Sequence, residues 1–131
     1  KKIIVVKGTT AETWLAASHP EIEPDKYEQY NDATSALADG RGDAWITDNT
    51  EALAWAIASD GFTAGITSLG DPDSIAGAVT KGNETLLSWL NEHLVTLGKE
   101  QFFHADFEQT LRPVYGDSAS AEELVVEGGQ L

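Results

Sequence analysis

Two short polar segments of this sequence could bind a small charged molecule. Gly8-Thr9-Thr10 follows the β-branched run at residues 2–6, and Asp48 follows an apolar segment at residues 43–47. Glycine lets a ligand approach the backbone, and the free N–H groups of a helix's first turn, with threonine hydroxyls, donate hydrogen bonds to an anion. A fixed carboxylate suits an ammonium group. Thr9, Thr10 and Asp48 together complement an α-amino acid zwitterion.

Helix capping is the competing interpretation of the same residues. Thr9 with Glu12, and Asp48 with Glu51, have the spacing of capping boxes. A threonine or aspartate at such a position needs no ligand to explain it. The choice between capping and binding depends on whether the side chains have hydrogen-bond capacity left over.

The elements around these residues alternate between strand and helix. Hydrophobic patterning predicts strands at residues 2–6, 27–30, 43–47, 62–68 and 74–80, with helices at 11–17, 32–38 and 52–58. Such alternation predicts an α/β fold with a mainly parallel sheet flanked by helices. Ligands of open α/β sheets bind beyond the carboxyl ends of the strands. We therefore expect Thr9, Thr10 and Asp48 at one edge of the sheet.

The rest of the chain is predicted to be helical. Leu86, Leu90, Leu94 and Leu97 form an apolar stripe on a helix that begins near Asn83 and has its C-cap at Gly98. A shorter helical pair is expected over residues 99–111, followed by an acidic tail that we expect to be poorly ordered. The domain prediction is an α/β ligand-binding lobe at 1–80 and a C-terminal helical extension at 81–131.

Composition excludes several classes of function. The chain has 131 residues, with 22 Asp and Glu against 8 Lys and Arg, so its formal charge is −14. This balance argues against binding nucleic acid or an anionic membrane. No cysteine is present, which removes disulfides, thiolate zinc sites and thiol nucleophiles. Because the chain starts at Lys1 and contains no Met, we expect a processed or excised piece of a longer protein.

No residue pattern indicates catalysis, a metal or a cofactor. His19, His93 and His104 lack metal-ligand spacing. Phosphate-binding glycine loops and serine nucleophile elbows are missing from the sequence. We expect no catalytic residue, no bound metal and no cofactor.

Several motifs, in order, resemble the second lobe of the family 3 extracellular solute-binding proteins, the polar amino-acid receptors of ABC importers. They are VKGTTAE at 6–12, YEQY at 27–30, ALADGRGDA at 36–44, TDNTE at 47–51, IAGAVTKGN at 75–83 and LLSWLN at 86–91. The resemblance implies a periplasmic binding protein-like II lobe. It also implies that Thr10, with Thr9 beside it, binds the ligand carboxylate and that Asp48 binds the ammonium. Either Val6 or Lys7 could point into the cleft.

The resemblance further implies partners and a location. These are a free L-amino acid, with glutamine or glutamate favoured, an ABC transporter permease, and the first lobe of the same protein, which this chain lacks. Residues after about Lys81 would normally pack on that first lobe, and their exchange between copies of the chain is an open alternative. The location implied is extracellular, periplasmic or lipid-anchored at the outer face of the bacterial cytoplasmic membrane.

Two other functions stay open at this point. A small α/β enzyme acting on an amino-acid-like substrate would need a general base or nucleophile on the sheet edge, where only Asp48 is available. A sensory or adhesion module could use the same fold without transport. The binding protein of an ABC importer is the favoured prediction.

Overall fold

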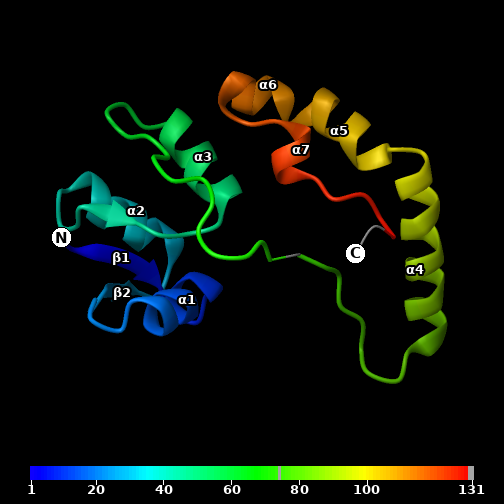
Figure 1. Cartoon of the computed structure of the whole chain (residues 1–131), viewed down its shortest axis with the longest axis horizontal. Helices are drawn as coiled ribbons and strands as arrows, with labels where there is room; N and C mark the ends of the chain where they lie inside the picture. The colour runs from blue at the N-terminus through cyan, green and yellow to red at the C-terminus, as the bar shows by residue number, and fades with distance from the viewer. Residues whose placement is uncertain (74, 130–131) are drawn as a thin grey trace. The chain divides into compact units, whose positions relative to one another are not determined.

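The computed structural model describes residues 1–73 and 75–129. The chain divides into two compact units, residues 1–71 and residues 72–131, and Figure 1 shows that the first holds the sheet and the second is helical. In the described part of the chain, no helix is long and apolar enough to cross a bilayer. Each unit is described separately below.

A parallel sheet organises the first unit. Its described strands, β1 (Ile3–Val6), β2 (Asp25–Tyr27) and β3 (Ala44–Trp45), have the order β2-β1-β3. β1 is central and its Ile4 and Val5 have no exposed surface, as a β-branched strand covered on both faces should. The expected α/β fold with a parallel sheet is confirmed.

Helices cover both faces of this sheet. α2 (Tyr30–Ala38) packs Ala33 and Ala36 against Ile4 and Val6. α1 (Thr10–Ser18) lies over the opposite face, because Lys26, which alternates with the core-facing Tyr27, forms an ion pair with Glu12 of α1. α3 (Asn49–Ile57) follows β3.

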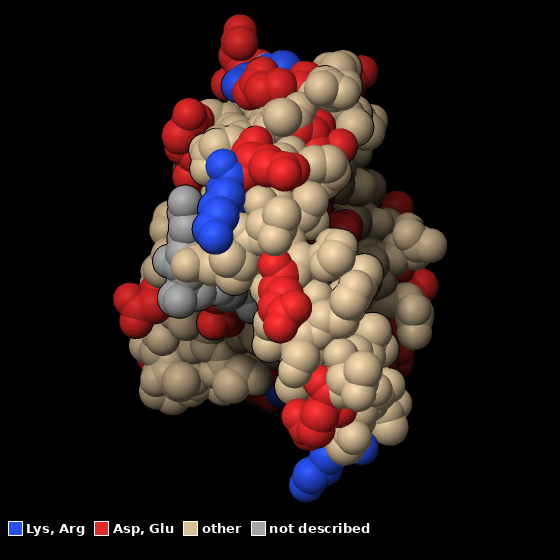
Figure 2. All heavy atoms as spheres, turned by 90° about the vertical axis from the view of Figure 1, so that its right-hand side faces the viewer, with Lys and Arg blue, Asp and Glu red and all other residues tan. Residues whose placement is uncertain are grey.

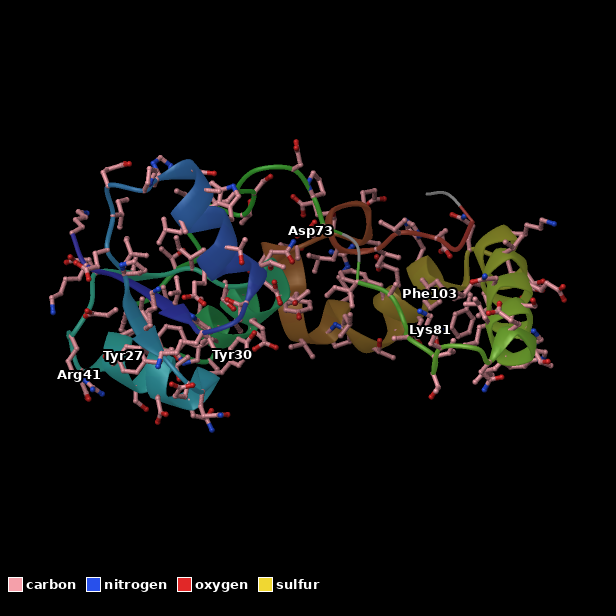
Figure 3. The ribbon with its side chains drawn as sticks, turned by 90° about the horizontal axis from the view of Figure 1, so that it is seen from below. Tyr27, Tyr30, Arg41, Asp73, Lys81 and Phe103 are labelled. Carbon is pink, nitrogen blue, oxygen red and sulfur yellow. The ribbon has the colours of Figure 1, made fainter. Side chains whose placement is uncertain are left out.

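A glycine ends α2 and turns the chain back toward β3. Gly40 has φ +71°, and its N–H donates to Leu37 O at 3.0 Å. The Arg41 N–H donates to Ala36 O at 2.9 Å, which completes a Schellman motif. The Arg41 guanidinium then lies over the Tyr27 ring at 5.9 Å from its centroid (Figure 3). The predicted end of this helix is therefore confirmed.

Aromatic rings attach α2 and α3 to β3. Trp45 makes edge contacts with Tyr30 of α2 and Trp55 of α3, at ring-centroid distances of 6.2 and 6.1 Å. Phe62 packs on Trp55 at 4.7 Å. The Trp45 indole N–H is buried without an acceptor among the described residues, so apolar packing fixes this ring.

Three predicted strands were wrong or displaced. The strand expected at 27–30 lies at Asp25–Tyr27, and Tyr30 starts α2 because its ring packs on Trp45. Residues 62–68 form no strand, and neither do the described residues 75–80; Ser74 lies outside the described residues. No described backbone pairs with these segments, and Ile66 and Ile75 are 70% and 91% exposed.

The second unit consists of helices. The described elements are α4 (Glu84–Lys99), α5 (Phe102–Thr110), α6 (Arg112–Tyr115), the 3₁₀ helix η1 (Gly116–Ser118) and α7 (Ala121–Leu124). The Asn83 side chain accepts from the Leu86 N–H and starts α4 as predicted. Phe107 and Tyr115 are the large rings of its core, stacked at 6.5 Å.

Close backbone packing explains one wrong prediction in this unit. Gly98 is not a C-cap: it lies inside α4, which continues to Lys99. Gly98 is buried, and a Cβ there would collide with the carbonyl oxygen of Gly128. The glycine is therefore needed for the approach of the C-terminal segment, and Gln101, at φ +53°, takes the left-handed position after the helix.

Two further predictions for this unit were wrong. One helix, α5, followed by the single turn α6, replaces the pair expected over residues 99–111. The acidic end is folded through Gly129 rather than poorly ordered. Arg112 helps to organise it, since its guanidinium donates to Ala119 O at 3.0 Å and pairs with Glu108 at 2.7 Å.

A buried carboxylate joins this C-terminal segment to α5. Glu127 is 1% exposed, and it accepts hydrogen bonds from the N–H groups of Phe103 and His104, at 3.4 and 2.9 Å, and from His104 Nδ1 at 2.8 Å. The α5 N-cap residue, Gln101, makes no side-chain cap bond. Glu127 therefore caps α5 from a distant part of the sequence.

The apolar stripe of α4 is partly exposed within the second unit, with Leu90 and Leu97 of intermediate burial. Trp89 is 52% exposed, and the other residues of this surface that are at least two-fifths exposed are Leu86, Leu87, Leu94 and Val95. Figure 2 looks onto the α4 side and shows uncharged side chains over much of it, with acidic ones scattered between.

Glu127→Gln should make the start of α5 insensitive to acid. Burial by itself raises the pKa of Glu127, but the bonds from His104 and Phe103 outweigh it and leave the pKa below the ordinary 4.5. The stabilisation is therefore present above pH 4.5 and is lost as the pH falls through the lowered value. Hydrogen-exchange protection of the Phe103 and His104 amides should drop between pH 6 and pH 3 in the parent, and should be lower and flat in the variant.

Glu122→Gln is the matched control, because Glu122 is an exposed acid of the same segment. It should keep the parent's pH dependence. Equal acid sensitivity in the parent and in the Glu127→Gln variant would contradict the role of Glu127 as the cap of α5.

Candidate functional site

The Gly8-Thr9-Thr10 turn joins β1 to α1, and capping occupies part of it. Thr9 Oγ1 accepts from the Glu12 N–H at 3.4 Å and donates to Val6 O at 2.7 Å. The Glu12 carboxylate accepts from the Gly8 N–H at 2.7 Å rather than from Thr9, so the predicted capping box is shifted by one residue. Its hydrogen bond with Lys26, followed by that from Gly8, lowers the pKa of Glu12.

Thr10 keeps its hydrogen-bonding groups available. It is the first residue of α1 and is exposed, and neither its N–H nor its hydroxyl has a partner among the described residues. The backbone at Gly8 has φ +75°, and a Cβ there would meet nothing within 4 Å. The turn therefore presents the Thr10 N–H and hydroxyl as donors that a ligand can reach, whereas the Thr9 hydroxyl is already used for capping.

Asp48 is the N-cap residue of α3, yet its carboxylate makes no cap hydrogen bond. Asn49 Oδ1 accepts the Thr50 N–H at 2.8 Å instead, so the prediction that Asp48 and Glu51 form a capping box is wrong. Asp48 is exposed and has no hydrogen bond or ion pair within the described part of the chain. Its full accepting capacity remains open to a ligand.

The strand register brings these groups to one edge of the sheet. Ile4 pairs with Trp45, and the Ile46 N–H donates to Ile4 O at 3.0 Å, which carries the ladder one residue beyond β3. The described pairing ends there; continued two residues further, the same register would set Asp48 opposite Lys7, directly before the Gly8 turn. Thr10 comes after β1 and Asp48 comes after the neighbouring parallel strand β3, so we expect both at the carboxyl edge of the sheet.

The choice between Val6 and Lys7 follows from burial. Val6 is 5% exposed and packs in the core with Ala33 and Ala36. Lys7 is exposed and forms an ion pair with Glu28. The strand residue available at this edge is therefore Lys7.

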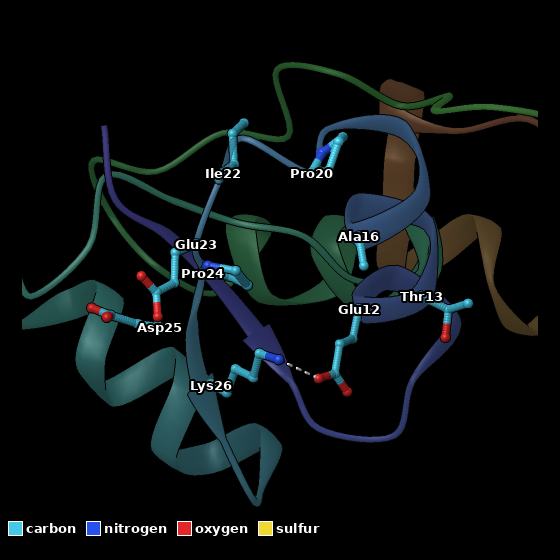
Figure 4. A pocket seen from close by; sticks show the side chains of 9 residues that line it. All are labelled: Glu12, Thr13, Ala16, Pro20, Ile22, Glu23, Pro24, Asp25 and Lys26. Atoms are coloured by element: carbon cyan, nitrogen blue, oxygen red, sulfur yellow. Dashed lines mark ion pairs between the residues drawn. The ribbon is translucent and has the colours of Figure 1, made fainter.

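A groove of about 900 Å³ lies elsewhere, between α1 and the segment that leads into β2. Figure 4 shows its lining residues and the ion pair of 2.9 Å between Lys26 and Glu12. None of Thr9, Thr10 and Asp48 lines it. The groove therefore does not contain the three predicted binding residues, although Glu12 of its lining accepts from the Gly8 N–H of the turn.

The described residues hold no group of three or more acidic or histidine side chains arranged to bind a metal. His104 belongs to the hydrogen-bond network around Glu127 in the second unit. Its role there is structural.

Comparison with solved structures reveals close neighbours of this fold. A cysteine-binding protein from Campylobacter jejuni superposes with a TM-score of 0.86 and 40% identity, over 98% of this chain and 52% of that protein. A solute receptor for L-cysteine from Neisseria gonorrhoeae superposes with a TM-score of 0.83 and 40% identity, over 93% of this chain and 50% of that one.

Sequence comparison leads to a protein of the same type. The ABC transporter glutamine-binding protein GlnH of Bacillus subtilis is 33% identical over 94 residues, which are 71% of this chain and 34% of that protein. No family model matches the chain. The chain spans about half the length of the solved receptors and about a third of GlnH.

The fold is thus that of periplasmic binding protein-like solute receptors. Within this class, the sequence and structural matches confirm the resemblance to the family 3 extracellular solute-binding proteins that bind amino acids. The roles of Thr9, Thr10 and Asp48 in binding stay predictions.

Two features of the structure escaped sequence reasoning. The sequence predicts only that Glu28 belongs to a strand. Its position beside Lys7 follows once the register of β1 and β2 is known. The bond network between Glu127 and His104 joins residues 23 positions apart. No local pattern indicates such a contact.

Thr9→Ala and Thr10→Ala should separate capping from ligand binding. Thr9→Ala removes both hydroxyl bonds of the cap and should lower the stability of α1 by about 1 kcal/mol. Thr10→Ala removes no hydrogen bond and should stay within about 0.5 kcal/mol of the parent. Native-state hydrogen exchange of the α1 amides measures both changes. Equal losses in the two variants would contradict this division of roles.

Proposed function

We propose that this chain is part of the substrate-binding component of an ABC importer and binds the backbone of a polar L-amino acid. Thr10 donates to the α-carboxylate through its N–H and hydroxyl, with the Thr9 N–H beside it. Asp48 accepts from the α-ammonium. This assignment is supported by the receptors of amino acids that the chain resembles in sequence and structure.

The observation that carries the proposal is the pair of unused polar groups at one sheet edge. Helix capping leaves Thr10 and the Asp48 carboxylate without partners among the described residues. A zwitterion presents an anion and a cation a short distance apart, so one small ligand satisfies both groups. Asp48 has no hydrogen-bonded nucleophile or second acid in the described part, and the arrangement therefore favours binding over proton transfer.

The side chain of the ligand is the less constrained part of the proposal. GlnH is named for glutamine, and the two solved neighbours are named for cysteine. The side chains of glutamine and cysteine are both small and carry no charge at neutral pH. We therefore extend the initial preference for glutamine or glutamate to include cysteine.

The other parts of the proposal concern partners and location. Residues 1–80 act as the second lobe, and residues 81–131 carry helices that pack on a first lobe, as the partly exposed apolar stripe of α4 supports. The loaded receptor delivers its amino acid to a permease. It works in the periplasm or outside the cell, free or held by a lipid anchor at the outer face of the cytoplasmic membrane.

Asp48→Asn should weaken amino-acid binding at least about tenfold, because a neutral amide replaces the acceptor of the ammonium. An NMR titration of the chain with L-glutamine and L-cysteine measures this through the amides of Gly8, Thr9, Thr10 and Asp48. One wall of a site buries little of a ligand, so dissociation constants near about 1 mM are expected.

The controls separate recognition of the ammonium from general effects. Asp60→Asn removes an exposed acid of the same unit and should leave the titration unchanged. Glutaramate, which is glutamine without its α-amino group, should bind the parent and the Asp48→Asn variant equally. Saturable binding of L-amino acids that Asp48→Asn leaves intact would contradict the proposal.

A further inference from the structure

Three charged residues form a row across the carboxyl edge of the sheet. Val6 pairs with Tyr27, and the Lys7 N–H donates to Tyr27 O at 2.9 Å, so the next pair along is Lys7 and Glu28. On the other side, β3 ends at Trp45 and the last ladder bond comes from the Ile46 N–H; continuing this register to residue 48 predicts that Asp48 lies opposite Lys7. The sequence of charges across the three strands is therefore Glu28, Lys7, Asp48, and we call these residues the edge row.

The members of the edge row point to the same face of the sheet. Tyr27, Val6 and Trp45 belong to the core on the α2 face. Residues of opposite parity point to the α1 face, as the pair between Lys26 and Glu12 shows. Glu28, Lys7 and Asp48 have that parity. They come after the strand ends, and continuing the alternation beyond those ends predicts that they lie on the side where α1 begins with Thr10.

Lys7 stands between two carboxylates and pairs with only one of them. Each neighbouring strand is about 4.8 Å away, within reach of a lysine side chain. The Lys7 ammonium forms its ion pair with Glu28, while Asp48 has no partner among the described residues. The other cation of this face, Lys26, is held by Glu12 at 2.9 Å. The ammonium groups of Lys7 and Lys26 are thus paired with acids other than Asp48.

This arrangement matters for a ligand ammonium, because Lys7 carries the same charged group. If Lys7 paired with Asp48, an incoming amino acid would have to displace it before reaching the carboxylate. A lysine that is already paired does not compete. The pair is exposed, with 48% and 70% of the two side chains accessible, so the competition it prevents amounts to a few-fold in affinity.

We propose that Glu28 is a positioning residue that holds Lys7 away from Asp48 and so keeps the Asp48 carboxylate open to the α-ammonium of the ligand. This inference rests on the proposed binding role of Asp48. Glu28 itself touches no ligand. It acts through Lys7 alone, so its effect should vanish when Lys7 is removed.

A ligand-free structure tests the tether directly. In crystals of the Glu28→Gln variant, the Lys7 ammonium should lie within about 4 Å of the Asp48 carboxylate, whereas parent crystals should retain the pair with Glu28. Glu23→Gln, which removes an exposed acid from the loop before β2, should leave Lys7 where it is in the parent. A Lys7 side chain that stays away from Asp48 in Glu28→Gln would overturn the inference.

Affinity provides the second test, with L-glutamine and L-cysteine as probes. Glu28→Gln should weaken binding about two- to fivefold in the parent, and the double variant Lys7→Met/Glu28→Gln should bind as Lys7→Met alone does. Glu28→Gln should have no effect in the Lys7→Met background, and Glu23→Gln should leave the parent's binding unchanged. A purely structural role for Glu28 would instead weaken binding by the same factor in the parent and in the Lys7→Met background.

The variants also separate the two proposals. If Asp48→Asn leaves amino-acid binding intact, the proposed function of this edge is wrong. If Asp48→Asn weakens binding and Glu28→Gln does not, the proposed function stands and the role of Glu28 is overturned. Both proposals are supported if Lys7 moves to Asp48 in Glu28→Gln and if Glu28→Gln lowers the affinity only when Lys7 is present.

Discussion

The first unit depends on the complete burial of one short strand. Ile4 and Val5 of β1 have no exposed surface and Val6 is nearly buried, so helices must cover both faces and a parallel strand must lie on each side. Each of these aliphatic side chains contributes roughly 1.5–3 kcal/mol by leaving water. Burial on both faces also fixes the register, because a slip of one residue would turn the core side chains to the opposite face.

That register determines the chemistry at the carboxyl edge. The central strand leads into α1 through Gly8, while Glu28 directly follows β2 and Asp48 comes three residues after the end of β3. Capping then decides which groups are used: the Thr9 hydroxyl and Glu12 serve the start of α1, whereas α3 starts without help from the Asp48 carboxylate. Among the described residues, Thr10 and the Asp48 carboxylate remain without a partner, and the Lys7 ammonium is paired with Glu28.

Local sequence signals predicted much of this unit. The β-branched run of β1, the cap at Thr9 and the Gly40 turn are each encoded by adjacent residues, and the structure contains all three. The strands expected at 62–68 and 74–80 are absent over their described residues, because a strand also needs a partner that no local pattern guarantees. Gly98 and Glu127 were misread or missed for the same reason: their contacts, with Gly128 and with α5, join distant parts of the sequence. At the site, residue spacing alone could not reveal that the Asp48 carboxylate makes no capping hydrogen bond.

The most direct test of the central claim is a crystal structure of this chain soaked with L-glutamine or L-cysteine. The account predicts that the α-carboxylate accepts hydrogen bonds from the N–H and hydroxyl of Thr10, and that the α-ammonium donates to Asp48, both at about 2.7–3.1 Å. An amino acid bound with its ammonium away from Asp48, or seated instead in the groove beside Lys26, would contradict it.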